Sequence, residues 1–164
     1  MIRAGIIAAA VTYFLAVHQT MLGGRMVLWG VSPDLLLVWT ACLGLRCGPA
    51  AGAVIGFASG TLQGSLAQGG IGAYGISKTV SGALAGLLAG KLSRENRLVP
   101  AMCAAALTVV NELVVLLVSR GGAPSHLLRF IGLRALYHAA LAAPVYPLVS
   151  WAWHALLRPR AAVS

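Results

Sequence analysis

Acidic residues are almost absent from this sequence. Only three Asp or Glu residues occur among 164, against twelve Lys or Arg, and charged residues make up 9% of the chain. Two acids near a single Lys do not form a recognisable acid–base set, so general acid–base catalysis is not indicated. The net charge of +9 comes from cations scattered singly at the ends of apolar stretches. That pattern is typical of membrane topology signals and not of a nucleic-acid-binding patch.

Motifs for metal binding, cofactor binding and nucleophilic catalysis are also missing. The three cysteines form no C-x-x-C pair, and Cys42 and Cys103 lie in apolar runs, as small packing residues do. The four histidines are widely separated, with no i, i+4 pair to hold a metal. Ser125 and His126 have no acid partner nearby, and no glycine-rich stretch leads into the Lys-Ser of a P-loop. We therefore expect no enzyme activity, no cofactor and no metal.

Apolar residues dominate instead, at 59% of the chain. Because a spanning helix needs about 20 apolar residues, five or six spans use about 120 and leave only short loops. We predict an all-α integral membrane protein, with residues 1–164 forming a single transmembrane domain of about six helices. The expected spans are residues 2–22, 26–45, 49–66, 71–92, 98–118 and 127–157. The last is too long for one straight helix, so Pro144 and Pro147 are expected to kink or divide it.

Two span boundaries carry clear helix signals. Ser32 is a candidate N-cap, followed by Pro33 at the first helical position and Asp34 in the first turn. The second helix therefore begins either at Ser32 or within the apolar run before it. Gly48-Pro49 ends the second span and opens the third with almost no loop, which predicts an antiparallel pair of neighbouring helices.

Basic residues near the span ends indicate the orientation. With six spans and a cytoplasmic N-terminus, the cytoplasmic side carries seven Lys or Arg and the other side three or four. The seven are Arg3, Arg46, Lys91, Arg94, Arg97, Arg158 and Arg160. The other three are Arg25, Arg120 and Arg129, and Arg134 makes a fourth if it lies near the end of its span. We predict a multi-pass protein with both termini in the cytoplasm, whereas five spans would place the termini on opposite sides.

Glycine returns every fourth residue from Gly44 to Gly64, and a shorter run follows from Gly82 to Gly90. In water each interior helical Gly costs about 0.5–1 kcal/mol relative to Ala. In lipid, a ridge without side chains lets a neighbouring backbone approach closely. The neighbour is either a partner's helix, or the same chain's own helix. The candidate packing or partner-binding residues are Gly52, Gly56, Gly60, Gly64, Gly82 and Gly86.

Ionisable side chains within lipid are costly, so each is a functional candidate. Lys78 and Glu112 are interpreted as a pair, either a proton or substrate site or, as we favour, a structural ion pair that fixes helix register. His138, four residues beyond Arg134, is a candidate lining residue of a polar patch. The intramembrane polar candidates are Asp34, Lys78, Asn111, Glu112, Arg134 and His138.

Several short motifs between residues 30 and 90 stand in a distinctive order. They are PDLLL at 33–37, LRCGP at 45–49, AAGAVIGF at 50–57, GGIGAY at 69–74 and SGALAG at 81–86. This order resembles the MreD family of bacterial rod shape-determining membrane proteins. The family often carries an acid shortly after the glycine ladder, whereas Gln63 and Gly64 occupy that stretch here. Any role of that acid is therefore in doubt for this chain.

The resemblance implies a non-enzymatic scaffold of the cell-elongation complex in the bacterial cytoplasmic (inner) membrane, which builds peptidoglycan. It implies MreC, RodA with its partner transpeptidase, and MreB as partners. Apart from the resemblance, we expect contact with membrane lipid, self-association through the glycine ridge, and no binding of nucleic acid, because the cations are scattered. The resemblance also implies a fold similar to the substrate-binding subunits of energy-coupling-factor transporters. The alternative function is therefore the substrate-binding membrane subunit of such a vitamin transporter.

Overall fold

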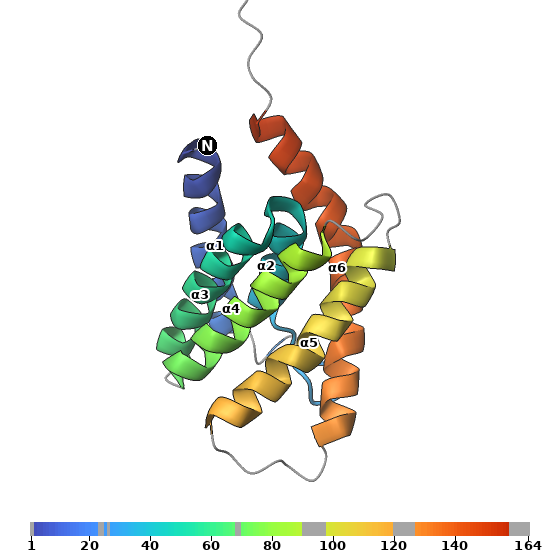
Figure 1. The fold of residues 1–164 in the computed structure, drawn as a ribbon. Helices are drawn as coiled ribbons and strands as arrows, with labels where there is room; N and C mark the ends of the chain where they lie inside the picture. The colour runs from blue at the N-terminus through green and yellow to red at the C-terminus, as the bar shows by residue number, and fades with distance from the viewer. Residues whose placement is uncertain are drawn as a thin grey trace, which may run out of the picture.

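The computed structural model describes residues 2–22, 25, 27–67, 70–89, 98–119 and 127–157, with six α-helices in these ranges. The helices are α1 (Ile2–Leu22), α2 (Leu35–Cys47), α3 (Pro49–Leu66), α4 (Ile71–Leu88), α5 (Leu98–Ser119) and α6 (Leu127–Leu157). They pack into one bundle (Figure 1). The prediction of an all-α fold with six helices is confirmed.

The short helix α2 forms the centre of the bundle. Nine of its thirteen residues are buried, and it packs against each of the other five helices. The buried apolar cluster combines residues of α2, α4, α5 and α6, among them Val38, Cys42, Leu43, Ala85, Cys103, Leu107, Ala142 and Tyr146. The apolar character of α2 therefore reflects its central position within the protein as well as any membrane setting.

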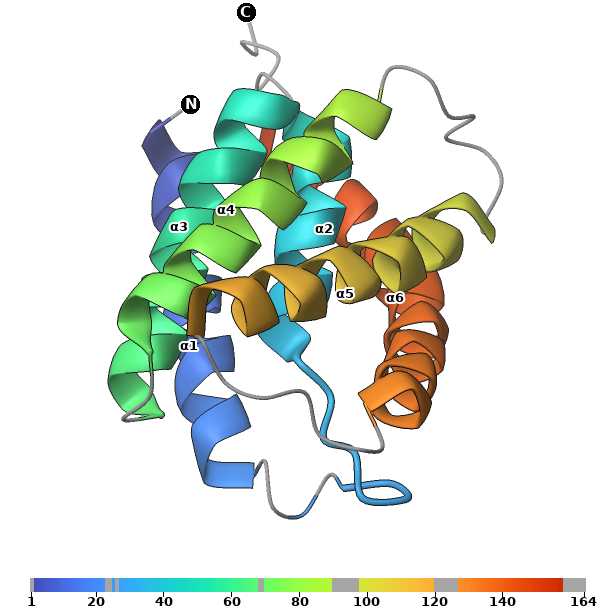
Figure 2. The ribbon, with the colours of Figure 1, turned by 60° about the horizontal axis from the view of Figure 1, so that its bottom comes forward.

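The remaining helices surround α2 in two close pairs. Helices α3 and α4 run side by side, and α5 packs against α6 (Figure 2). Helix α1 makes looser contacts with α2, α3 and α6, and most of its residues are exposed or half-buried. Helices α2 and α3 are joined by Gly48 alone and pack together, as the Gly48-Pro49 boundary predicts.

The start of α2 differs from the prediction. Ser32 is not the N-cap, because Asp34 holds that position with an extended backbone and accepts a hydrogen bond from the backbone N–H of Leu37. Before it, Leu28 and Val31 exchange backbone hydrogen bonds of 3.0 Å around two residues with positive φ. That tight turn prevents the helix from beginning in the earlier apolar run.

Two further boundaries need correction. Helix α4 ends at Leu88, earlier than the predicted residue 92, and residues 90–92 lie outside the described ranges. The prolines Pro144 and Pro147 do not divide the last stretch, because both lie inside the continuous helix α6. The helix changes direction along its length instead (Figure 1). Membrane helices tolerate interior prolines because neighbouring groups satisfy the freed carbonyls.

By length and composition, only one described helix is long and apolar enough to cross a membrane, over Leu98–Val118. Gly5–Met21 and Leu35–Cys47 are apolar but shorter. The number of spans therefore stays a prediction, and so does the orientation. Much of the basic-residue count falls on positions outside the described ranges, namely Lys91, Arg94, Arg97, Arg120, Arg158 and Arg160.

Candidate functional site

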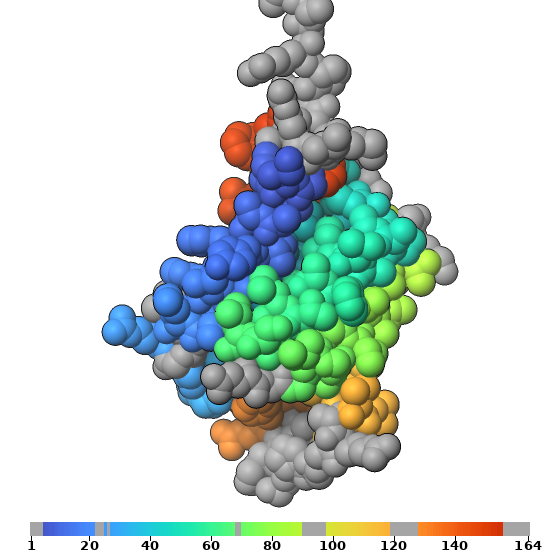
Figure 3. All heavy atoms as spheres, turned by 90° about the vertical axis from the view of Figure 1, so that its left-hand side faces the viewer, coloured from blue at the N-terminus to red at the C-terminus, as the bar shows by residue number. Residues whose placement is uncertain are grey.

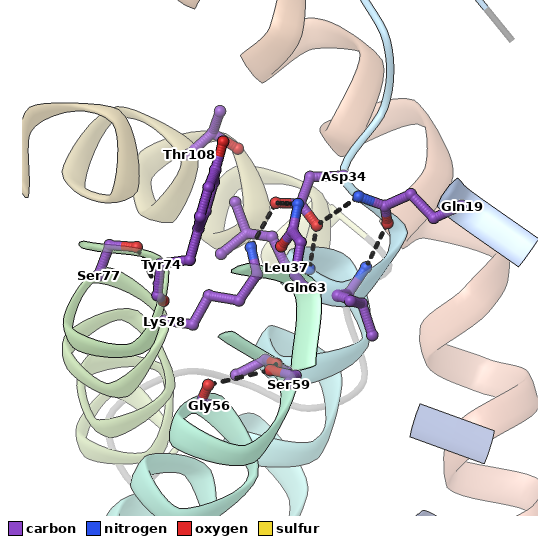
Figure 4. A network of polar contacts seen from close by, with 12 residues as sticks. Gln19, Asp34, Leu37, Gly56, Ser59, Gln63, Tyr74, Ser77, Lys78 and Thr108 are labelled. Carbon is purple, nitrogen blue, oxygen red and sulfur yellow. Dashed lines mark hydrogen bonds and ion pairs between the residues drawn. The ribbon is translucent and has the colours of Figure 1, made fainter. Parts of the chain in front are cut away.

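A network of polar side chains is buried at the start of α2, with the carboxylate of Asp34 at its centre (Figure 4). Its Oδ1 accepts hydrogen bonds from Leu37 N at 2.9 Å and from Gln19 Nε2 at 3.4 Å. Its Oδ2 accepts from Lys78 Nζ and from Gln63 Nε2, the latter at 3.4 Å. Four donors match the four lone-pair positions of a carboxylate, so this buried charge is satisfied within the protein.

Lys78 supplies the opposite charge from α4. Its side chain is fully buried, and its Nζ forms an ion pair with Asp34 Oδ2. The predicted pairing of Lys78 with Glu112 is therefore wrong. Asp34, at the N-cap of α2, is itself buried within the bundle. Pairing with a carboxylate is what allows an ammonium group to remain at full burial.

His138 joins the network from α6 with no exposed surface. The backbone N–H of Asp34 donates to His138 Nε2 at 2.7 Å, so that ring nitrogen carries a lone pair. The proton then belongs on Nδ1, which lies 2.7 Å from Thr108 Oγ1, and the Thr108 hydroxyl donates in turn to the carbonyl of Ala104. His138 is thus a neutral imidazole that connects α2 to α5.

A second ion pair lies beside the first and is less deeply buried. Arg134 Nη1 contacts Glu112 Oε1 at 2.7 Å, with 18% and 15% of the two side chains exposed. Arg134 Nε also donates to the carbonyl of Ser32 at 3.2 Å, which fixes the segment leading into Asp34. Asn111, next to Glu112, is buried and its Oδ1 has no hydrogen-bond partner among the described residues.

The network connects the helices through buried groups. Its members come from α1, α2, α3, α4, α5 and α6, and the three central groups Asp34, Lys78 and His138 are all inaccessible. Three cavities of the bundle are lined by residues other than these three. Among the described residues no cluster of His, Cys, Asp or Glu could hold a metal ion. The chemistry available here is the fixing of helix positions.

Three members of the network carry no charge and were not identified from the sequence. Gln19 at the end of α1 accepts from Leu36 N with its Oε1, at 3.2 Å, besides donating to Asp34. Gln63 on α3 and Thr108 on α5 complete the set. A polar residue within an apolar span is the one signal that could have indicated them, because an unpaired amide in lipid is costly.

The glycine ladder contacts α4 of the same chain. A Cβ atom on Gly52, Gly56 or Gly60 would overlap the backbone carbonyls of Gly82, Lys78 and Tyr74. A Cβ atom on Gly44 of α2 would lie 2.7 Å from the carbonyl oxygen of Gly82. A Cβ atom on Gly86 of α4 would overlap the backbone at Gly48 and Pro49. Gly64 is also buried on α3. Gly90 lies outside the described residues. The described part of the ladder is thus filled by the protein's own backbone.

An apolar groove remains open between α1 and α3. It has a volume of about 660 Å³ and is walled mainly by small residues. Its lining comprises Gly5, Ala8, Ala9 and Thr12 of α1, Ala51, Val54, Ile55, Ala58 and Leu62 of α3, and Cys47 and Trp153. Helices α1 and α3 lie side by side on this face of the molecule (Figure 3). The sequence analysis did not predict this groove.

The described helices form a bundle with buried ion pairs, many exposed apolar side chains and closely packed glycines, which are features typical of helical membrane proteins. A family model described as 5TMR of 5TMR-LYT matches residues 1–142, so the chain belongs to this five-transmembrane family of multi-pass membrane proteins. The resemblance to MreD is thereby overturned, because motifs of glycine, alanine and leucine recur wherever helices pack closely in lipid. No curated protein and no solved structure matches the chain.

Proposed function

We propose that this protein is a non-enzymatic membrane scaffold that binds the transmembrane helix of a partner protein in the groove between α1 and α3. The supporting observation is the groove's lining. Gly5, Ala8 and Ala9 face it from one helix, and Ala51 and Ala58 from the other. Small residues on both walls allow a third backbone to approach closely, which is how helices associate in lipid.

The shape of the groove favours a helix over a compact ligand. On α3 the lining runs from Ala51 to Leu62, about 16 Å at 1.5 Å per residue. That is three helical turns and about half the hydrocarbon thickness. Polar groups that orient a small substrate are almost absent, since Thr12 is the main hydroxyl and it already donates to Ala8 O. Nothing observed here favours the transporter-subunit alternative.

The expected membership of the cell-elongation complex was based on the resemblance to MreD, which the family match overturns. MreC is still a useful first partner to assay, because a single-span protein offers one helix of the kind the groove fits. The support for a helical partner comes from the groove itself. RodA, its transpeptidase and MreB, all predicted from the same resemblance, have no separate support.

Site-specific photocrosslinking in native membranes tests the proposal. A photoreactive residue replaces Ala58, which lines the groove, or the adjacent Phe57, which is exposed but lies outside it. We expect Ala58 to crosslink to the transmembrane segment of a membrane protein identified by peptide mass spectrometry, and Phe57 not to do so. Crosslinks from Ala58 only to lipid, or only to a second copy of the chain, would refute a helical partner.

A matched pair of substitutions on α1 provides the second arm. Ala9→Leu fills the groove, whereas Ala10→Leu adds the same volume at an exposed position outside it. We expect Ala9→Leu to abolish the Ala58 crosslink and Ala10→Leu to leave it unchanged, with both variants folded. Co-purification with MreC is measured on the same pair. If the two variants give the same crosslinking and the same co-purification, the partner does not bind in the groove.

A further inference from the structure

We propose that a second site, at the ends of α2 and α6, binds one anionic phospholipid, with its phosphate on Arg46 and His154 and an acyl chain in the adjoining apolar pocket. This site goes beyond the scaffold proposed above, and it does not depend on it. Two features support it: Arg46 is a cation without a carboxylate partner, and an apolar pocket lies near it on α2.

Arg46 is a cation whose side chain contacts an imidazole and no carboxylate among the described residues. Its Nη2 contacts the ring nitrogens of the exposed His154, at 2.6 Å to Nε2 and 3.3 Å to Nδ1. Its Nε is buried and has no hydrogen-bond partner among the described residues. The two described carboxylates, Asp34 and Glu112, are paired with Lys78 and Arg134. Arg46 therefore holds a full charge and an unused donor with only an imidazole beside it.

The pocket lies next to this cation on α2. It has a volume of about 240 Å³ and a mostly apolar lining from α1, α2 and α6. The lining residues are Ile7, Ala8, Val11, Trp39, Leu43, Leu148, Val149, Ala152 and Trp153, of which Ile7 and Leu148 are exposed and flank its mouth. Leu43 lies three residues before Arg46, on the same face of the helix, and Trp153 directly precedes His154.

Contacts along α1 place the pocket toward the Arg46 end of α2. Gln19 of α1 binds at the start of α2, and Thr12 accepts a hydrogen bond from Trp39 Nε1 at 2.9 Å, so the two helices are antiparallel. The same register sets Ile7 and Ala8 beside Leu43 and toward Arg46. The pocket therefore lies toward the end of α2 that carries Arg46, and its lining includes the exposed side chains of Ile7 and Leu148.

These features match the chemistry of an anionic phospholipid. An apolar pocket offers water no hydrogen-bond partners, and hydrocarbon chains are the apolar molecules present in a bilayer. A phosphate diester accepts hydrogen bonds from the forked donors of a guanidinium. A zwitterionic headgroup also contains a phosphate, but it carries a cation that repels the guanidinium. Basic pockets between transmembrane helices bind such headgroups.

Native mass spectrometry of the full-length chain in a non-ionic detergent tests this site. The delipidated protein receives phosphatidylglycerol or phosphatidylcholine with identical acyl chains, and a third sample receives glycerol 3-phosphate alone. We expect phosphatidylglycerol to be retained roughly fivefold more than phosphatidylcholine, the preference expected for one cation near an anionic lipid. It should also raise the unfolding temperature, and glycerol phosphate should do neither.

Variants assign the effect to the two halves of the site. Arg46→Gln and His154→Gln should each reduce the preference for phosphatidylglycerol, whereas Arg129→Gln, an exposed cation at the other end of α6, should retain it. Ala152→Leu narrows the pocket and should lower retention of both lipids. Because His154 is exposed, His154→Gln should fold, and its lipid preference can be measured even if Arg46→Gln fails to fold.

Four results would overturn the proposal. They are equal retention of the two lipids, a preference unaffected by both Arg46→Gln and His154→Gln, the same stabilisation by glycerol phosphate alone, and a dimer whose formation excludes the lipid. The variants at Ala9 and Ala58 probe the groove and not this pocket, so failure of the helix-docking proposal is recorded by different residues.

Discussion

The ammonium group of Lys78 and the carboxylate of Asp34 form an ion pair in which both side chains are buried, although 44 residues separate them in the chain. Removing one partner of such a pair leaves an uncompensated charge inside the protein. Two of the six helices are joined by this contact, and the backbone of Asp34 joins a third through His138. The pair therefore controls how α2, α4 and α6 are positioned.

The first prediction concerns this pair. Lys78→Met should lower the free energy of unfolding by about 3–5 kcal/mol, because the carboxylate of Asp34 is left buried without its counter-charge. The double variant Lys78→Met with Asp34→Asn should recover a large part of that loss, since the Asn side chain still caps α2. Tryptophan fluorescence during chemical unfolding in micelles measures both. Equal losses in the single and double variants would mean that the charges are not coupled.

The second prediction separates two glycines. Gly56→Ala should destabilise the bundle by about 1–3 kcal/mol, because the new methyl group overlaps the carbonyl of Lys78 and forces α3 away from α4. Gly72→Ala on α4 has no atom within 4 Å of the added carbon and should be neutral or stabilising. The same unfolding assay compares them.

A larger residue at Gly56 is expected to act within the protein. Gly56→Leu should prevent the native packing of α3 on α4, with loss of thermal unfolding cooperativity in the isolated chain. If Gly56→Leu folds normally and only the association with another protein is lost, the ladder has an external contact that the bundle does not account for.

Helix positions could be predicted from the sequence wherever a long apolar run ends in a loop. The bounds of α1, α3 and α6 agree with the expected residues because their runs stop at polar or glycine-rich segments. The start of α2 could not be predicted in this way. It is fixed by a tertiary contact, the hydrogen bond from Asp34 N to His138, and by the turn between Leu28 and Val31. The local signals of Ser32, Pro33 and Asp34 favoured an N-cap at Ser32, two residues before the observed N-cap at Asp34.

The polar candidates could be listed from the sequence, but their pairing could not be predicted from it. Lys78, Asp34 and His138 stand out because ionisable side chains in apolar spans are few and costly. Which carboxylate meets Lys78 depends on how the helices are rotated around α2, and the sequence spacing contains no such information. Gln19 and Gln63 are neutral and lie near span ends, so they looked like boundary residues.

The tautomer of His138 is the third prediction. The imidazole should carry its proton on Nδ1 and keep a lone pair on Nε2, because Nε2 accepts from the backbone N–H of Asp34. Nitrogen-15 chemical shifts of the labelled imidazole in micelles identify the tautomer directly. A proton found on Nε2 would contradict the hydrogen bond to Asp34.

Removal of that imidazole should have a matching cost. His138→Ala leaves the N–H of Asp34 and the hydroxyl of Thr108 with one partner fewer, so we expect a loss of about 1–3 kcal/mol in the free energy of unfolding. His154→Ala removes an exposed imidazole from the same helix and should change stability little. Losses of similar size in both variants would show that burial of the His138 ring in the network has no energetic weight.

The last prediction concerns the attachment of α1. This helix packs loosely and borders two open cavities. Its hydrogen bonds to α2 should therefore contribute much of what holds it against the bundle. Gln19 binds both Asp34 and the N–H of Leu36. Gln19→Ala should therefore increase amide hydrogen exchange throughout α1 without a comparable increase in α3 or α4, because those two helices are held by backbone contact. Thr20→Ala is the matched control, since the Thr20 hydroxyl bonds only to Ala16 within α1. If exchange in α1 is the same in both variants, apolar contacts alone hold the helix, and the groove beside it is then a fixed feature of the bundle.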